Sequence, residues 1–458
     1  MNLDFTKKQH IHFIGIGGIN MSSLAQVLLT RGFTVSGSDF KDSELVHSLR
    51  EMGAEIAIGH SADNITEDIS LVVYTAAIKP DNPELVRAIE LGIPTATRAE
   101  FLGQLMKNYD LAICVSGTHG KTTTTSLISQ ILLDNDTDPT IMVGGMLPAI
   151  GGNTRIGHSG NFITEACEYT NSFLSFFPTL EVVLNVKADH LDFFKDLDDI
   201  RNSFRVYTHL LPDDGTLIIN GEIDNLPYFT DDLKCRVITF GMDGDYAFTA
   251  HNVSYDDLAC GEYDLYKDNE FVCHVKLGIP GEYNVSNSLA AFAAADAIGI
   301  NPADAVRSID KFTGVDRRFQ YKGNIGGVTI IDDYAHHPDE IAATLGAALK
   351  CPHKKLWVIF QPHTYSRTKA LFDEFAASLS AADAVVLTDI YAAREKDTLG
   401  ISSKDLQKKI ASLGCESYYF PTFDEVENFI LDHCSTGDMV ITMGAGDVYQ
   451  IADHLTGK

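Results

Sequence analysis

The segment that most constrains the fold is SGTHGKTTTTS, residues 116–126, because different kinds of apolar sequence flank it. Leu111–Val115 is an unbroken apolar run that predicts a buried strand, whereas Leu127–Leu133 has apolar residues at helical spacing. A strand, a tight glycine loop and a helix together gather backbone N–H groups and a helix N-terminus around a phosphate. The segment therefore predicts an α/β fold with a site for nucleotide phosphates.

The match to the P-loop pattern G-x-x-x-x-G-K-[ST] is incomplete, since Val115 stands where the first glycine belongs. Lys121 supplies a cation for the phosphates and Thr122 a hydroxyl for Mg²⁺. Taken alone, these residues also fit a glycine turn capped by threonines, but the flanking strand and helix favour the phosphate site. The expected nucleotide contacts are Gly117, Thr118, His119, Gly120, Lys121, Thr122 and Thr123.

Composition limits the partners and the compartment. A chain of 458 residues predicts about three domains, and 63 acidic against 35 basic residues give a net charge of −28. That charge repels a nucleic-acid backbone, so we expect no nucleic-acid partner. There is neither a signal-peptide stretch nor a run of about 18 apolar residues, so we expect no membrane insertion and a cytoplasmic protein. The eight cysteines form no C-x-x-C pair and predict reduced thiols.

The first domain, expected over residues 1–107, has the layout of a dinucleotide-binding fold. The apolar run from Ile11 ends in glycines at Gly15, Gly17 and Gly18, and an acidic residue, Asp39, follows about 20 positions later. Met21 replaces the last glycine of the G-x-G-x-x-G pattern, which argues against ordinary NAD binding. Arg98 is expected at the ligand-binding edge of this sheet, where it either reaches a ligand or remains a solvated surface residue.

The second domain, expected over residues 108–314, contains two more apolar runs that end in candidate ligands. These runs predict Glu165 and His190 at the ends of parallel strands beside the phosphate loop. Glu165 and Thr122 suit Mg²⁺, whereas His190 is a less usual magnesium ligand. A solvated acid and a structural histidine are the alternatives for Glu165 and His190.

Residues 216–279 alternate short strands with turns and predict an antiparallel part of the domain. Asn284 and Asn287, three positions apart, precede or begin an alanine-rich helix. Considered alone, they fit an N-cap pair.

The third domain, expected over residues 315–458, contains four apolar strands that each end in polar or glycine residues. The strand ends read DDYAHHP from Asp332, QPHTYSR from Gln361, TD from Thr388 and GAGD from Gly444. Because the carboxyl ends of parallel strands form the ligand-binding edge of a sheet, we expect a Rossmann-like third sheet with a binding edge.

In this order, the motifs HFIGIGG, SGTHGKTTTT, EACEY, ADHLD, DRRF, DDYAHHP, FQPHTYSRT and GAGD closely resemble the Mur ligase family over essentially the whole chain. The resemblance implies a Rossmann-like UDP-sugar domain, a central P-loop ATPase domain and a C-terminal domain that closes over ATP and binds the amino acid. Within the family, the resemblance favours the branch that joins L-alanine to UDP-N-acetylmuramate through an acyl phosphate, as a monomer or weak homodimer.

The resemblance also implies roles for individual residues. Lys121, His190, Arg318, Asp333 and His336 take catalytic positions, and Thr122, Glu165 and His190 hold Mg²⁺, with two ions expected. The ATP site further includes Asn284 and Asn287 on the adenine side, with Arg318, Arg317 beside it, and Asp333. His336, His363 and Arg367 face the amino acid. The UDP-sugar edge comprises Gly15, Gly17, Gly18, Asn20, Met21, Ser22, Ser38 and Asp39.

The chain departs from the family at two positions. Tyr283 stands where histidine is common, and Thr364 stands where many alanine-adding members have arginine. The region of residues 202–205 lacks the lysine that sibling ligases carbamylate, as in the alanine-adding branch.

Three alternatives remain open on the sequence alone. They are a murein-tripeptide recycling ligase of the same architecture, a non-catalytic UDP-sugar-binding regulator, and an NAD-dependent dehydrogenase with an appended domain. The broken glycine pattern and the second nucleotide site disfavour the dehydrogenase.

Overall fold

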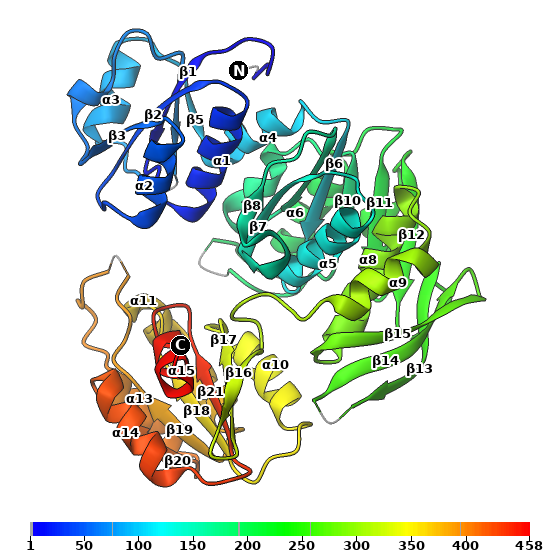
Figure 1. Ribbon diagram of the computed structural model, residues 1–458, viewed down its shortest axis with the longest axis vertical. Helices are drawn as coiled ribbons and strands as arrows, with labels where there is room; N and C mark the ends of the chain where they lie inside the picture. Colours follow the sequence, from blue (N-terminus) through cyan, green and yellow to red (C-terminus); the bar gives the residue numbers. More distant parts are fainter. Residues whose placement is uncertain (1–2, 76, 191–192, 257, 394) are drawn as a thin grey trace. The chain divides into compact units, whose positions relative to one another are not determined.

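The computed structural model describes residues 3–75, 77–190, 193–256, 258–393 and 395–458. The helices and strands form three sheets (Figure 1). By its internal contacts the chain divides into two compact units. The first unit comprises Met1–His251, Asp264–Cys273 and Ser286–Ile309, and the second comprises Asn252–Tyr263, His274–Val285 and Asp310–Lys458.

The N-terminal sheet has five parallel strands in the order β3-β2-β1-β4-β5. Because β1 lies between β2 and β4, the glycine loop that follows it begins where the strand order reverses, which is where such folds bind ligands. The strands are β1 His10–Ile14, β2 Thr34–Asp39, β3 Glu55–Ile58, β4 Leu71–Tyr74 and β5 Thr95–Thr97; the helices are α1 Ile19–Thr30, α2 Glu44–Glu51, η1 Ala62–Asn64, α3 Pro83–Glu90 and α4 Arg98–Met106.

The central sheet has ten strands in the order β15-β14-β13-β12-β11-β10-β6-β9-β7-β8. β6 lies between β10 and β9 and is parallel to both, so the phosphate loop emerges between their carboxyl ends. The strands are β6 Leu111–Ser116, β7 Thr140–Leu147, β8 Gly152–Arg155, β9 Asn161–Glu165, β10 Leu180–Val183, β11 Thr216–Asn220, β12 Arg236–Gly241, β13 Phe248–Tyr255, β14 Cys260–Lys267 and β15 Glu270–Pro280. The helices are α5 Lys121–Asp134, η2 Pro148–Ile150, η3 Tyr169–Ser175, α6 Leu197–Thr208, α7 Pro227–Thr230, α8 Tyr283–Ala297 and α9 Pro302–Lys311.

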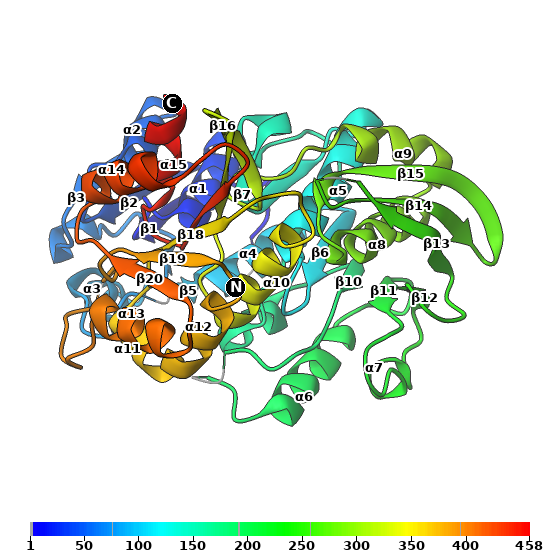
Figure 2. The ribbon, with the colours of Figure 1, turned by 90° about the horizontal axis from the view of Figure 1, so that it is seen from below.

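The expectation of an antiparallel part over residues 216–279 was wrong for its first strands, β11 and β12. β11 is parallel to β10 and to β12, and β12 is parallel to β13, so the region that begins at Thr216 continues the parallel sheet. Strands β13, β14 and β15 lie side by side beyond it (Figure 2). Asp268 and Asn269 connect β14 to β15 and both have positive φ, as a two-residue hairpin turn requires.

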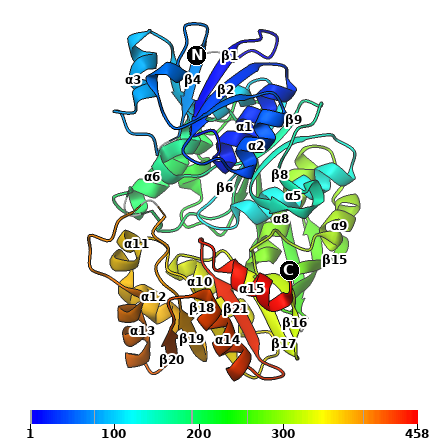
Figure 3. The same ribbon diagram turned by 60° about the vertical axis from the view of Figure 1, so that its left-hand side comes forward.

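The C-terminal sheet has six strands in the order β16-β17-β21-β18-β19-β20 (Figure 3). It is parallel apart from the edge strand β16. In β18, Val358 and Phe360 join one apolar cluster and Trp357 and Ile359 another, so helices cover both faces. The elements are β16 Gln320–Ile325, β17 Val328–Asp333, β18 Leu356–Phe360, β19 Ala384–Leu387, β20 Glu416–Tyr419 and β21 Met439–Met443, with α10 Pro338–Ala348, α11 Tyr365–Ala370, α12 Phe372–Leu379, α13 Ser403–Ser412, α14 Phe423–His433 and α15 Tyr449–Thr456.

The predicted α/β class with mostly parallel sheets is confirmed. The short strand β5 and the partly exposed edge strands β16 and β20 were missed, since none of them is a continuous buried apolar run. All eight cysteines are free in the structure. Among the described residues, every helix is too short or too polar to cross a bilayer.

Candidate active site

The phosphate loop between β6 and α5 leaves the start of its helix open to an anion. Gly117 and Gly120 have φ of +138° and +89°, a region in which residues with a side chain are strained. Gly120 is the N-cap of α5, no side chain caps the helix, and its first turn has no acidic residue. By contrast, α4 and α14 each carry a capping box. The free N–H groups of α5 therefore suit a phosphate.

The loop is held from behind by the segment that follows β10. Asn185 accepts a hydrogen bond from the backbone N–H of His119 at 2.9 Å and donates one to the carbonyl oxygen of the same residue at 2.9 Å. The hydroxyl of Thr118 accepts a hydrogen bond from the backbone N–H of Lys187 at 2.9 Å. These contacts fix the loop before any ligand binds, so binding requires little reorganisation of the backbone.

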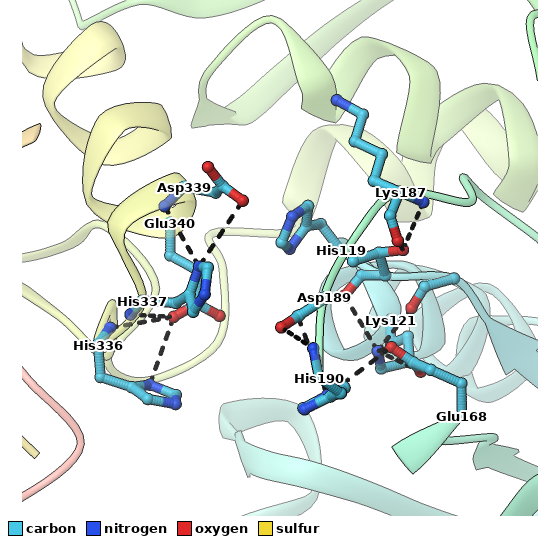
Figure 4. A network of polar contacts seen from close by, with 12 residues as sticks. His119, Lys121, Glu168, Lys187, Asp189, His190, His336, His337, Asp339 and Glu340 are labelled. Atoms are coloured by element: carbon cyan, nitrogen blue, oxygen red, sulfur yellow. Dashed lines mark hydrogen bonds and ion pairs between the residues drawn. The ribbon is translucent and has the colours of Figure 1, made fainter. Parts of the chain in front are cut away.

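Lys121 lies within this loop as a charged ammonium group. Its Nζ donates hydrogen bonds to the carbonyl oxygens of Gly117 and Thr118 and lies 2.9 Å from Oε2 of Glu168 (Figure 4). Burial alone would lower the pKa of Lys121, but the adjacent Glu168 carboxylate helps to raise it above its ordinary value. Lys121 is therefore a fixed cation at neutral pH.

Glu168, Asp189 and His190 bring their ligand atoms within 4.8 Å of one another beside Lys121. Nε2 of His190 lies 3.9 Å from both the Glu168 and the Asp189 carboxylates. Two carboxylates are the kind of oxygen donors that Mg²⁺ prefers, so this donor set fits a magnesium ion. The described structure thus brings His190 to the phosphate loop as predicted; Leu191 and Asp192 of the same motif lie outside the described residues.

The sequence prediction missed Glu168 and Asp189. It chose Glu165, which ends β9 opposite Val115 and accepts a hydrogen bond from the backbone N–H of Gly144 at 2.6 Å. The signal for Glu168 was present, since EACEY contains two glutamates three positions apart. Thr122, in the first turn of α5, is buried.

Both predicted adenine-side residues lie within the first five residues of α8 and are buried. Oδ1 of Asn287 lies 2.6 Å from the point that a Cβ on Gly120 would occupy, so only glycine fits there. Asn284 donates a hydrogen bond to the carbonyl oxygen of Pro280 at 2.7 Å. Tyr283, at the position that departs from the family, begins α8 and is 43% exposed.

The glycine loop after β1 is a second backbone site for an anion. α1 begins after Gly18 without a side-chain cap and without an acidic residue in its first turn. The backbone N–H of Gly17 donates to Oδ2 of Asp39 at 2.9 Å. Gly15 has a φ of +82°, and a Cβ there would lie 2.8 Å from Cγ2 of Thr75. The loop therefore requires glycine both for its conformation and for its close contact with Thr75, the residue after β4.

The side chains predicted at this UDP-sugar edge separate into two groups. Asn20 is exposed, whereas Met21, Ser22 and Ser38 are buried. The Ser38 hydroxyl donates to Oε2 of Glu84 at 2.6 Å, and its carbonyl oxygen accepts from the N–H groups of the glycine loop. Ser38 therefore supports the loop from beneath.

In the second unit, Asp333 ends β17 and lies close enough to the predicted Arg318 to feel its charge. Its carboxylate accepts hydrogen bonds from the N–H groups of Phe319 and Ala335 at 2.7 and 2.8 Å. Burial raises the pKa of Asp333 to about 6, against the lowering effect of Arg318. Arg317 differs from Arg318, because its guanidinium binds Asp332 and the carbonyl oxygens of the loop after β21 and so holds its own sheet together.

His336, His363 and Arg367 are brought together as predicted. The two imidazole rings lie 5.8 Å apart, and Nη1 of Arg367 lies 3.3 Å from Nδ1 of His363. Burial lowers the pKa of His336, and it lowers that of His363 to about 4. Both rings are therefore neutral near pH 7. Thr364 follows with a φ of +64° and precedes α11.

The tautomers of the two histidines differ. Nδ1 of His336 lies 3.0 Å from the carbonyl oxygen of Tyr334 and 3.3 Å from Oε2 of Glu340, the second contact being drawn in Figure 4. Both oxygens accept, so Nδ1 carries the proton and Nε2 keeps a lone pair. Nδ1 of His363 accepts from Arg367, so its Nε2 carries the proton. His336 is therefore the better proton acceptor of the pair.

Comparisons with known proteins agree with this arrangement of two loops and a third sheet. Models of the Mur ligase family match three successive regions: its catalytic domain at residues 10–110, its middle domain at 115–295 and its glutamate ligase domain at 317–446. The chain belongs to the Mur ligase family. For this Mur ligase, the NAD-dependent dehydrogenase alternative no longer applies.

Individual relatives cover the full length of this Mur ligase. It is 57% identical to a UDP-N-acetylmuramate–L-alanine ligase of Lachnospira eligens, over 99% of each chain. It is 55% identical to the enzyme of that name from Agathobacter rectalis, over 100% of this chain and 99% of the relative. The crystal structure of UDP-N-acetylmuramate-alanine ligase from Thermotoga maritima matches with a TM-score of 0.81 and 31% identity, over 98% of each chain.

Proposed function

We propose that this Mur ligase joins L-alanine to UDP-N-acetylmuramate at the expense of ATP, in the synthesis of cell-wall peptidoglycan precursors. The proposal rests on Lys121, which is a partly buried, charged cation in an uncapped phosphate loop. It draws its substrates from the relatives that match over the full chain and carry that name.

The proposed reaction has two steps. An oxygen of the muramyl carboxylate attacks the γ-phosphorus of ATP, and the bond from that phosphorus to the β,γ-bridging oxygen breaks. ADP is the leaving group, and the muramyl carboxylate becomes an acyl phosphate. The amine nitrogen of L-alanine then attacks the acyl carbon, phosphate leaves, and the nitrogen loses a proton. Two anions meet in the first step, so the main requirement is positive charge at the transferring phosphoryl group.

In the first unit, Lys121 and the N–H groups from Gly117 to Thr123 hold the ATP phosphates, and Asn287 supports the loop near the adenine side. Thr122, Glu165 and His190 remain our proposed Mg²⁺ ligands, with Glu168 added from the structure. Mg²⁺, with two ions proposed, would supply further positive charge to the phosphates. The UDP portion of the sugar nucleotide binds the glycine loop after β1.

In the second unit, we assign His336 as the acceptor of the amine proton, because its Nε2 keeps a lone pair near pH 7. Arg367 and His363 position the amino acid. Arg318 and Asp333, together with Asn284, complete the proposed nucleotide site. We also propose that this C-terminal part closes over ATP during turnover, since an acyl phosphate must be kept from water.

The experiment that tests this function is phosphate release with ATP, Mg²⁺ and UDP-N-acetylmuramate while the acceptor is varied. We expect release to depend on L-alanine. Dependence on a preformed tripeptide would instead identify a murein-tripeptide recycling ligase, and binding of the UDP-sugar without any phosphate release would identify a regulator. The protein is proposed to act in the cytoplasm as a monomer or weak homodimer. Light-scattering measurement of the molar mass of the purified protein would check the oligomeric state.

A further inference from the structure

Arg98 lies on the ligand-binding edge of the N-terminal sheet. The strand registers align Ile14 with Tyr74 and Tyr74 with Thr97, so the next residues, Gly15, Thr75 and Arg98, form one row across that edge. Adjacent strands are about 4.8 Å apart, which places the Arg98 backbone roughly 10 Å from the glycine loop.

The helix that Arg98 begins packs directly against the central part of the first unit. A Cβ on Gly103 of α4 would lie 1.9 Å from the carbonyl oxygen of Ser175 in η3, so the two backbones touch. Nζ of Lys107, just after α4, lies 3.6 Å from the ring centroid of Phe177. Cys167, in this central part, is close enough to both Arg98 and Lys121 to act on each of them electrostatically. Arg98 therefore shares a row with the glycine loop and begins the helix that contacts the part of the first unit carrying the phosphate loop.

The guanidinium of Arg98 lacks a counter-ion in the described part of the chain, where it makes neither an ion pair nor a hydrogen bond. The nearest acid in sequence, Glu100, is occupied by the capping box with Thr97. Burial lowers the pKa of Arg98, but a guanidinium remains protonated at neutral pH. A half-buried cation of this kind favours an anionic ligand.

We infer that Arg98 binds the muramyl carboxylate of the substrate and directs it toward the phosphoryl group held at Lys121. The inference rests on the proposed function, in which one substrate must extend from the glycine loop to the phosphate loop. The diphosphate is a less suitable partner, because it is placed by the N–H groups of the glycine loop, two strands away. Arg98 is thus a positioning residue for the attacking group.

Two sugar nucleotides separate these possibilities without requiring turnover. UDP-N-acetylmuramate and UDP-N-acetylglucosamine share the uridine, the diphosphate and the amino sugar, but only the first has the lactyl carboxylate. We expect Arg98→Gln to weaken binding of UDP-N-acetylmuramate by about 10- to 100-fold in calorimetry, the loss of a charge-assisted contact, and to leave UDP-N-acetylglucosamine unchanged. Arg98→Lys keeps the positive charge but loses the two-pronged guanidinium. Its affinity for UDP-N-acetylmuramate should therefore lie between those of the wild type and Arg98→Gln.

The matched control is Arg87→Gln, which removes a surface arginine of α3 that pairs with Glu90 in the same domain. It should leave both affinities unchanged. Equal weakening of both ligands by Arg98→Gln would assign Arg98 to the diphosphate, and unchanged binding of both would make its role structural; either result overturns the inference. Phosphate release by the wild-type protein tests the proposed function separately, so the two failures can be told apart.

Discussion

The two glycine loops use the same backbone device but differ in charge. Each follows a buried parallel strand and opens a helix that has neither a side-chain cap nor an acidic first turn. The loop after β1 contains no cation, and the carboxylate of Asp39 accepts from its Gly17 N–H. The loop after β6 contains Lys121, which pairs with Glu168. The first loop thus suits a diphosphate that remains intact, and the second suits a phosphoryl group that is transferred.

The polar interiors behind the two loops differ as well. Behind the first, the buried Glu84 carboxylate contacts Ser38, His60 and Asn64 at 2.5–3.0 Å and His12 at 3.8 Å. In the strand β10 beside the second loop, both carboxylate oxygens of the buried Glu181 lack a hydrogen-bond partner among the described residues. One glutamate therefore stabilises its domain, whereas the other is a destabilising buried acid.

The largest expected effect is at Lys121, where the two loops differ most. Lys121→Ala should lower turnover by more than ~100-fold in a folded protein, because a fixed cation at a transferring phosphoryl group contributes several kcal/mol. UDP-N-acetylmuramate affinity should change little, since we propose that this ligand binds the other loop. Steady-state kinetics measure the turnover and calorimetry measures the affinity. Lys195→Ala, which removes an exposed lysine, is the control. Near-normal turnover of the folded variant would contradict the assignment of phosphoryl transfer to the loop that contains Lys121.

The next effect is on stability behind the first loop. Burial alone would raise the pKa of Glu84, but contacts from His12, Ser38 and Asn64 lower it below its ordinary value. A lowered pKa means that Glu84 stabilises the folded state above its unfolded pKa, and that this contribution is lost as the pH falls through the folded pKa. Glu84→Gln should therefore reduce the free energy of unfolding by about 2 kcal/mol at pH 7 and by less at pH 4 in urea titrations. An unchanged or increased stability at pH 7 would contradict this.

The opposite pH dependence of stability is expected for the buried glutamate beside the second loop. Burial raises the pKa of Glu181 well above its ordinary value. The contribution of Glu181 to the free energy of unfolding is therefore most favourable below its pKa in the unfolded chain. That contribution is lost as the pH rises through its pKa in the folded protein. Relative to Glu181→Gln, the wild-type free energy of unfolding should fall by about 1.4 kcal/mol per pH unit within that window. A pH-independent difference between the two proteins in urea titrations from pH 5 to pH 8 would show that Glu181 has a partner.

Local signals explain which features the sequence predicted. The phosphate loop and strands such as β18 were predictable because a glycine turn between a buried strand and a helix, or a run such as LWVIF, depends on neighbouring residues only. The direction of β11 and β12 was not, since pairing partners are distant in sequence. Similarly, the turn after β9 decides that Glu168, and not Glu165, contacts Lys121, and no spacing rule reveals that turn.

The most direct test of the central claim follows an oxygen atom. If the loop at Lys121 serves transfer of a phosphoryl group to the muramyl carboxylate, one carboxylate oxygen must leave in inorganic phosphate. UDP-N-acetylmuramate labelled with ¹⁸O in that carboxylate would be incubated with the protein, ATP, Mg²⁺ and L-alanine, and the phosphate analysed by mass spectrometry. We predict one ¹⁸O atom in each phosphate released. Unlabelled phosphate, or label recovered in AMP, would contradict the account.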